Sequence, residues 1–214
     1  MTSNHSREVQ SSNLADKLNE AVCSGPFMHP VIHLPEDYWV FDFTKGADPD
    51  FVCPYEYQIG RYDEVRPGMY DFELFGGVRD LHVGIDIGGP VGTPVHAFSS
   101  GFVFSMGINP EEGSYGPTII TQHRWKDRDI WALHGHLSLE SLEMVKQGEE
   151  ITEGQIIATI GSKEVNGGWE PHLHFQLSWE MPEGYDMPGV VARENREKSL
   201  QIYPDPRMVL GPIY

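Results

Sequence analysis

The stretch GWEPHLHFQL, residues 168–177, alternates polar and apolar side chains along its second half. Successive residues of a β-strand point to opposite sides of a sheet, so this pattern predicts a strand with one polar and one apolar face. The polar face would carry His172, His174 and Gln176, and the apolar face would carry Leu173, Phe175 and Leu177. Two imidazoles on a rigid strand can place one nitrogen on a metal ion and another beside the ion's open position. We therefore expect a metal-dependent site on the polar face.

A second stretch, His82-Val83-Gly84-Ile85-Asp86, repeats this arrangement. At strand spacing His82 and Asp86 share one face, and Gly84 leaves the space between them free. One histidine nitrogen and one carboxylate oxygen from here, with one histidine from residues 172–174, would make three protein ligands. Catalytic zinc sites have this number and keep a fourth position for water.

Spacing alone is weak support for such a site, because the HxH pair occurs twice, at His134/His136 and His172/His174. What strengthens the hypothesis is that these clusters all lie in strand-like runs with apolar backs. Holding imidazoles there is costly unless they have a purpose.

Short β-rich runs punctuated by glycine dominate the chain from residue 78 onward, which predicts a mostly β fold with antiparallel sheets and one or two short helices. The helix inside this region is predicted over Leu139–Lys146. We expect residues 1–77 to form an N-terminal wrapping arm with a short helix after Asn13, residues 78–180 to form the core, and residues 181–214 to form an extension packed on it.

The composition limits the partners of the protein. The 214 residues carry a formal net charge of −17, which would repel nucleic-acid phosphates and anionic membrane surfaces. We therefore expect no nucleic-acid and no membrane partner, and any polymer substrate must be held locally. The first thirty residues lack an apolar segment behind a basic start, so we expect no secretory signal and cytoplasmic residence, with export by another route left open.

Several further motifs occur in a fixed order along residues 82–175. They are H-x-G-x-D-I (82–87), P-V-G-T-P-V-x-A (90–97), G-x-V (101–103), H-L-S (136–138), Q-G-x-x-I-x-x-G-Q-x-I-x-x-x-G (147–161) and P-H-L-H-F (171–175). In this combination residues 78–180 resemble the lysostaphin/LytM-type zinc metallopeptidases. The flanks, including IGRYDEVRP, resemble a subgroup of that family in which the peptidase domain is fused to aminotransferase domains.

The resemblance implies a fold related to barrel-sandwich hybrids, with antiparallel sheets that form a groove. It also implies a zinc ion held by His82, Asp86 and His174, with His136 and His172 as the catalytic pair. His134 stands two residues before the H-L-S histidine, and the H-L-S context favours His136 over it. The other histidines, His5, His29, His33, His96 and His123, are expected to be surface or structural residues.

The resemblance further implies a zinc-dependent endopeptidase that cleaves peptide bonds, including glycine-containing peptides or the peptide cross-links of peptidoglycan. Two alternatives stay open: a cytoplasmic metallohydrolase of a peptide or amide metabolite, and a catalytically silent binding module of the same fold. The Gln147–Gly161 hairpin also resembles lipoyl and biotinyl carrier domains, but the turn Glu149–Glu153 lacks the lysine that carriers modify.

Overall fold

A computed structural model describes residues 28–214. The strands are β1 (Trp39–Val40), β2 (Gln58–Gly60), β3 (Glu64–Val65), β4 (Arg79–His82), β5 (Ile85–Gly88), β6 (Pro94–His96), β7 (Gly101–Asn109), β8 (Gly116–Trp125), β9 (Arg128–Gly135), β10 (Glu150–Ile151), β11 (Ile156–Thr159), β12 (His172–Ser178) and β13 (Val190–Ala192). The helices are α2 (Ser141–Met144), α3 (Arg196–Ile202), α4 (Arg207–Leu210) and the 3-10 turns η1 (Glu73–Phe75) and η2 (Arg193–Asn195). The predicted mostly β class is confirmed.

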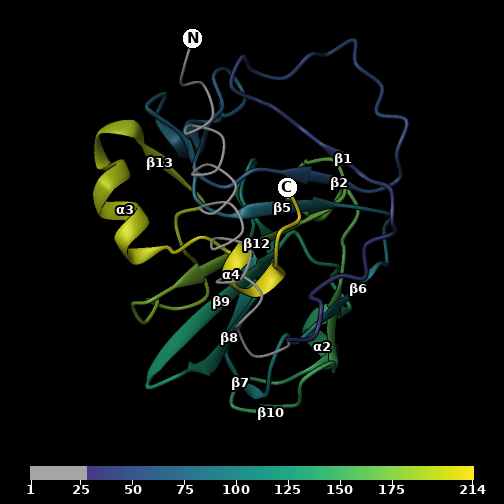
Figure 1. The fold of residues 1–214 in the computed structure, drawn as a ribbon, viewed down its shortest axis with the longest axis vertical. Coiled ribbons are helices and arrows are strands. Elements are labelled where there is room, and N and C mark those ends of the chain that lie inside the picture. The colour runs from purple at the N-terminus through teal and green to yellow at the C-terminus, as the bar shows by residue number, and fades with distance from the viewer. Residues whose placement is uncertain (1–27) are drawn as a thin grey trace, which may run out of the picture.

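The main sheet has eight strands in the order β1-β2-β5-β12-β9-β8-β7-β10, and its pairs are antiparallel except β1 with β2. Strand β12 lies in the interior of this sheet, between β5 and β9. Its register places His174 opposite Asp86 on β5 and opposite Gly135 on β9. The sheet thus brings the sequence-distant segments 85–88, 128–135 and 172–178 side by side (Figure 1).

The alternation predicted for β12 is confirmed. Leu173, Phe175 and Leu177 are fully buried in the largest hydrophobic cluster, on the core side of the sheet. His172 and His174 lie on the opposite side and line a cleft. Burying three large apolar side chains contributes roughly 1.5–3 kcal/mol each, which fixes the register and so the side to which the imidazoles point.

The expectation of one continuous strand from His82 to Asp86 is wrong. The chain leaves β4, which belongs to a three-stranded sheet β13-β4-β3, and enters β5 of the main sheet after Val83 and Gly84. A Cβ atom at Gly84 would lie 2.5 Å from Nε2 and Cε1 of His174, so only glycine leaves room for that ring. The break therefore brings His82 and Asp86 from two different sheets to one place.

The predicted helix over Leu139–Lys146 is shorter than expected and spans only Ser141–Met144. The Ser138 hydroxyl accepts a hydrogen bond from the Ser141 amide at 3.3 Å, and the Ser141 hydroxyl receives one from the Thr159 amide at 3.0 Å. The amides of Ser141, Leu142 and Glu143 donate to carbonyls three residues earlier, which is a 3-10 pattern, and the extended Val145 (φ −137°, ψ 168°) ends the helix. The helix expected after Asn13 lies outside the described residues.

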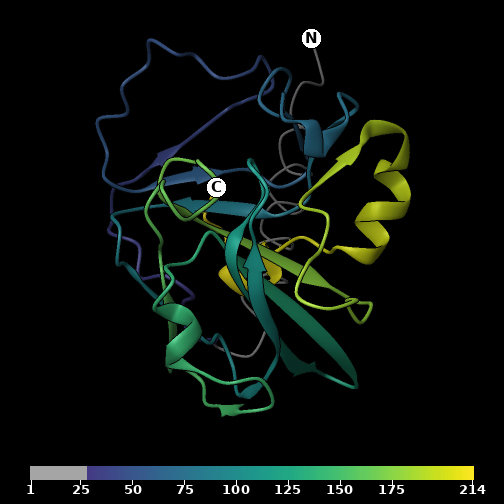
Figure 2. The same cartoon turned by 180° about the vertical axis from the view of Figure 1, so that it is seen from behind.

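The segments on either side of residues 78–180 supply strands and cover the sheets. Strands β1 and β2 extend the main sheet beyond β5, and β13 pairs with β4. The loops around β1 and β2 arch over one flank of the molecule, and α3 lies at the opposite flank (Figure 2). Met208, Val209 and Leu210 of α4 pack against the main core, with Ile213 and Tyr214. Three short α-helices occur among residues 28–214, and none is long and apolar enough to cross a bilayer.

Candidate metal centre and cleft

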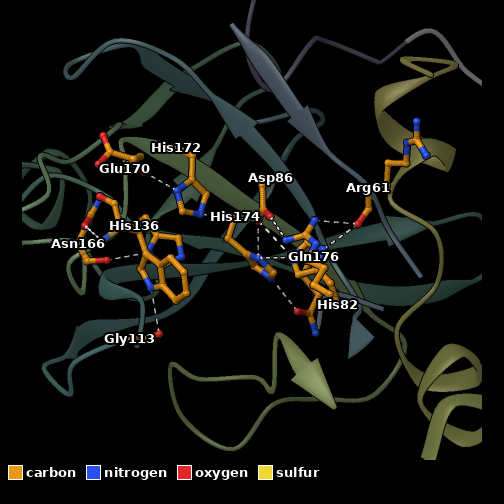
Figure 3. Close-up of polar contacts among 12 residues, drawn as sticks. Arg61, His82, Asp86, Gly113, His136, Asn166, Glu170, His172, His174 and Gln176 are labelled. Atoms are coloured by element: carbon orange, nitrogen blue, oxygen red, sulfur yellow. Dashed lines mark hydrogen bonds and ion pairs between the residues drawn. The ribbon is translucent and has the colours of Figure 1, made fainter. Parts of the chain in front are cut away.

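Three side chains from β4, β5 and β12 direct one donor atom each to a common point (Figure 3). The distances are 3.1 Å between His82 Nε2 and His174 Nδ1, 3.2 Å between His82 Nε2 and Asp86 Oδ1, and 3.0 Å between His174 Nδ1 and Asp86 Oδ1. Donor atoms bound to a tetrahedral zinc ion at about 2.0–2.1 Å are separated by roughly 3.3 Å. The three atoms therefore already have nearly the mutual spacing that such an ion requires.

The outer nitrogens of these two rings fix which nitrogen carries a proton. His82 Nδ1 is 2.9 Å from the Arg61 carbonyl oxygen, and His174 Nε2 is 2.9 Å from the Gln176 side-chain oxygen. Both oxygens only accept hydrogen bonds, so both outer nitrogens must donate. The neutral rings then turn two lone pairs toward each other and toward the Asp86 carboxylate. Three acceptors at this distance repel one another unless a cation or proton lies between them, so the residues fit a divalent metal ion.

A buried arginine from the N-terminal arm supports the carboxylate. Arg66 donates to Asp86 Oδ2 at 2.7 Å, to Glu64 at 2.9 Å and to the Tyr70 hydroxyl at 3.1 Å. Burial alone would raise the pKa of Asp86, but His82 and Arg66 outweigh it and hold this pKa well below its usual range. Burial and the Arg66 charge lower the pKa of His82 to about 4. The centre is therefore set up with an ionised carboxylate and a neutral imidazole.

His136 and His172 lie beside this centre as a second pair, with ring centroids 4.2 Å apart. His136 Nδ1 donates to the Asn166 carbonyl at 2.8 Å, and His172 Nδ1 donates to the Glu170 carbonyl at 2.7 Å. Each Nε2 is left unprotonated, and that of His172 lies 3.7 Å from Asp86 Oδ1. Burial, together with His172 and His174, lowers the pKa of His136 well below its usual value, and burial also lowers the pKa of His172.

The backbone of His136 explains how this ring reaches the pair. His136 follows the last residue of β9 and has a left-handed φ of 62°. Histidine is one of the few residues besides glycine that adopt this region with some frequency. The turn swings the His136 side chain out of the strand alternation and into the cleft.

His134 lies on the other side of the sheet from His136. Its ring packs 5.5 Å from Phe175, and burial lowers its pKa to about 3. Its Nε2 has no hydrogen-bond partner among the described residues. His123 is also buried, with its Nε2 2.7 Å from the Thr121 hydroxyl. His29, His33 and His96 gather in a separate cluster, whereas His5 lies outside residues 28–214.

The centre forms the floor of a cleft of about 740 Å³. One wall is aromatic and comes mainly from the arm, and its rings are Phe41, Phe43, Phe51, Tyr70, Phe75 and Trp169. Trp169 lies 6.5 Å from the His136 ring and packs edge-on against Phe72 and Tyr70. Its ring nitrogen donates to the Gly113 carbonyl at 3.0 Å. The cleft can thus hold an extended chain with apolar side chains above a polar floor.

Sequence patterns did not identify Arg66 or the aromatic rings of residues 41–75 as parts of this site. Arg66 stands twenty residues before Asp86, and no spacing connects the two. The only available signal was the position of Arg66 within IGRYDEVRP, one of the flanking stretches on which the subgroup resemblance rests.

The central part of the chain is similar to known peptidases. Residues 80–185 match the model of peptidase family M23. The DD-carboxypeptidase/endopeptidase Mpg of Neisseria meningitidis is 34% identical over 96 residues, and the peptidoglycan DD-endopeptidase ShyC of Vibrio cholerae is 33% identical over 102. Each alignment covers 45% of this chain and 20% of the relative, so the chain spans about a fifth of their length.

The catalytic domain of lysostaphin from Staphylococcus simulans aligns with 66% of this chain and 92% of its own, at 26% identity and a TM-score of 0.45. The uncharacterized lipoprotein YgeR of Escherichia coli is 34% identical over 96 residues, which cover 45% of this chain and 34% of YgeR. The expectation of cytoplasmic residence is contradicted, because these relatives are named as a lipoprotein and as endopeptidases, one of them of peptidoglycan, a polymer outside the cytoplasm.

Proposed function

We propose that the protein is a zinc-dependent endopeptidase of peptidase family M23, whose model residues 80–185 match. The observation that carries this proposal is the convergence of three unprotonated donor atoms, 3.0–3.2 Å apart, beside two further imidazoles in one cleft. The donors are two imidazole nitrogens and one carboxylate oxygen, a ligand set typical of zinc.

In this proposal His82, Asp86 and His174 hold the ion. When bound, zinc polarises a carbonyl group and lowers the pKa of a coordinated water toward about 7. Asp86 stays ionised as a ligand and does not act as the base. Arg66 holds the other oxygen of Asp86, so that Oδ1 faces the ion, and the Arg61 carbonyl and Gln176 oxygen orient the two rings.

The roles left for His136 and His172 are those of a general base and a general acid. Each ring holds its Nδ1 proton against a backbone carbonyl, so Nε2 is the atom that can accept or donate a proton in the cleft. Their lowered pKa values keep both rings neutral at neutral pH, ready to accept a proton. The ring that becomes protonated can then donate to the leaving amine.

A peptide is the substrate class that suits the cleft. The aromatic wall offers apolar contact to substrate side chains, and the net charge of −17 disfavours a grip on anionic polymer strands. The relatives' names support a cross-link peptide of peptidoglycan as the specific substrate. The flanks of the motif region support placement in the aminotransferase-fused subgroup, with 1–77 as an arm, 78–180 as the peptidase core and 181–214 as an extension.

The experiment that tests this proposal uses the zinc-loaded chain with purified peptidoglycan fragments and with a panel of peptides, including glycine-containing ones. We expect new amino termini to appear with the wild type and not with a His174→Ala control. Loss of activity on removal of the metal and recovery with Zn²⁺ would support the metal dependence. A zinc-loaded protein that releases no amine from either substrate class would favour a silent binding module of the same fold.

A further inference from the structure

Three histidines outside the cleft form a second cluster. The ring centroids of His29, His33 and His96 are 5.1, 5.0 and 4.9 Å apart, and one nitrogen of each ring lies within 4.8 Å of the others. None of the three lines the cleft described above. Within residues 28–214 no carboxylate lies in ion-pair distance of these rings, so the cluster is not an ordinary charge pair.

The backbone explains why two of these rings point the same way. Val31 and Ile32, between His29 and His33, are buried in the main core, with exposed fractions of 0% and 4%. The His29 amide donates to the Phe98 carbonyl at 3.0 Å, and the His96 amide donates to the Val31 carbonyl at 2.8 Å. These hydrogen bonds hold the bend at residues 29–33 against β6 and the residues after it. His29 and His33 therefore lie beside His96.

Hydrogen bonds to carbonyl groups also select the protonated nitrogen in two of the rings. His29 Nδ1 is 2.9 Å from the Pro30 oxygen, and His96 Nδ1 is at a longer 3.4 Å from the Val31 oxygen. Both Nδ1 atoms must donate, which leaves both Nε2 atoms as acceptors. The imidazoles of the metal centre in the cleft have their outer nitrogens held in the same way.

Space and mobility at the cluster suit a ligand set that closes around an ion. Gly154, with a φ of 77°, leaves room for His29, because a Cβ atom there would lie 2.9 Å from the His29 ring. The His33 side chain is exposed and makes no hydrogen bond with another described residue, so its ring can turn toward the other two. To share a tetrahedral ion the nitrogens must approach from within 4.8 Å to roughly 3.3 Å, and rotation of the exposed His33 side chain can shorten its distances to the other two.

From this geometry we infer that His29, His33 and His96 form a second metal site, which binds a late divalent transition metal and joins the bend at residues 29–33 to β6. Three neutral imidazoles select Zn²⁺, Cu²⁺ or Ni²⁺ over Mg²⁺ and Ca²⁺, which prefer oxygen ligands. Without a carboxylate the bound ion keeps its full double charge, in contrast to the ion expected at His82, Asp86 and His174. The site serves attachment of the chain segment and takes no part in peptide hydrolysis.

The test counts metal on the full chain. After dialysis against micromolar Zn²⁺, we expect two zinc ions per wild-type chain, one in His33→Ala, one in His174→Ala and none in the double variant. His33 is exposed, so His33→Ala should keep the fold, which circular dichroism checks. Asp37→Asn, an exposed change in the same segment, is the matched control and should keep two ions.

A second readout separates specific binding from loose surface binding. In the His174→Ala background, one equivalent of Cu²⁺ should give an electron paramagnetic resonance spectrum with hyperfine splitting from several imidazole nitrogens. The replacements His33→Ala and His29→Asn should each weaken Cu²⁺ binding at least tenfold. One zinc ion per wild-type chain, or two in His33→Ala, would overturn the inference, as would a copper spectrum that does not change in either variant.

Discussion

Histidine side chains lie on both faces of the sheet at β9 and β12, but the groups around them differ. On the core face His134 packs against Phe175, fully buried, with one nitrogen unpartnered among the described residues. On the cleft face, His136 Nδ1 donates to the Asn166 carbonyl and His174 Nε2 donates to the Gln176 side-chain oxygen. The other nitrogen of His174 lies beside His82 Nε2. Burial lowers the pKa of both His134 and His136. What distinguishes the cleft is therefore the arrangement of hydrogen-bond acceptors around each ring.

The largest difference between the faces should come from removing a ligand. His174→Ala deletes one of three donor atoms, so we expect loss of the cleft metal and a fall in kcat/KM beyond the ~10⁴-fold upper range for one general acid or base. Metal analysis and peptide hydrolysis measure both effects. The matched core-face change His134→Phe should keep metal and activity, and stoichiometric metal in the cleft of His174→Ala would contradict the ligand assignment.

A smaller effect is expected from the neighbouring pair. His136→Ala and His172→Ala leave the three donors intact, so zinc should stay bound while kcat falls by about 10²–10⁴-fold. Steady-state kinetics on zinc-loaded variants provides the measurement. Unchanged activity in His136→Ala together with an inactive His134→Ala would show that the core-face histidine had been misjudged.

The arm contributes to the cleft face through Arg66, and its replacement should act through Asp86. Arg66→Met leaves Asp86 and the buried Glu64 without their partner, so we expect zinc affinity to fall about 10–100-fold and unfolding free energy by about 3–5 kcal/mol. Competition with a chelator and urea denaturation measure the two quantities. Arg66→Lys, which keeps the charge but not the forked geometry, should lie between Arg66→Met and the wild type. Equal zinc affinity in all three proteins would show that Arg66 does not support zinc binding.

The last prediction concerns the core face alone and depends on pH. Burial lowers the pKa of His134 to about 3 and that of His123 to about 4, whereas an unfolded histidine titrates near 6.5. Below pH 6.5 the unfolded chain takes up protons that the folded chain does not. Unfolding free energy should therefore fall by up to about 1.4 kcal/mol per pH unit for each ring as pH drops from 6.5 toward 4.

His134→Phe removes one of these groups and keeps an apolar ring beside Phe175. Urea denaturation of the metal-free protein at several pH values should give a slope about 1.4 kcal/mol per pH unit shallower than that of the wild type. An identical slope would mean that His134 is protonated in the folded chain or reached by water.

The sequence predicted the faces of β12 correctly because alternation there is enforced by fully buried Leu173, Phe175 and Leu177. The same reasoning was wrong between His82 and Asp86, since the chain crosses from one sheet to another at Gly84, a position defined by the ring of a residue ninety positions away. Local patterns contain no information on such a contact. The family resemblance does not depend on the strand assignment, because its motifs name His82 and Asp86 directly.

The contact of Arg66 with the metal centre and the second histidine cluster could not be predicted for a related reason. Arg66 joins the centre through an ion pair across the fold, and His96 meets His29 and His33 only after the bend at Val31 is buried. Each of these residues looks like an ordinary surface residue in the sequence. Only the packing of residues 28–77 on the sheet brings them into place.

The interior position of β12 determines which parts of the protein open first. Residues 172–175 of this strand pair with β5, and residues 174–178 pair with β9. His174 and Phe175 therefore have a paired strand on both sides. Amide hydrogens there should exchange with deuterium only when the whole domain unfolds, whereas loops such as residues 162–170 should exchange through small local openings. The proposed ligand His174 therefore lies on the slowest-exchanging part of the chain, and Trp169 lies in a loop that exchanges faster. Adjustment to substrates of different size then falls to the wall, while the geometry at the metal stays constant.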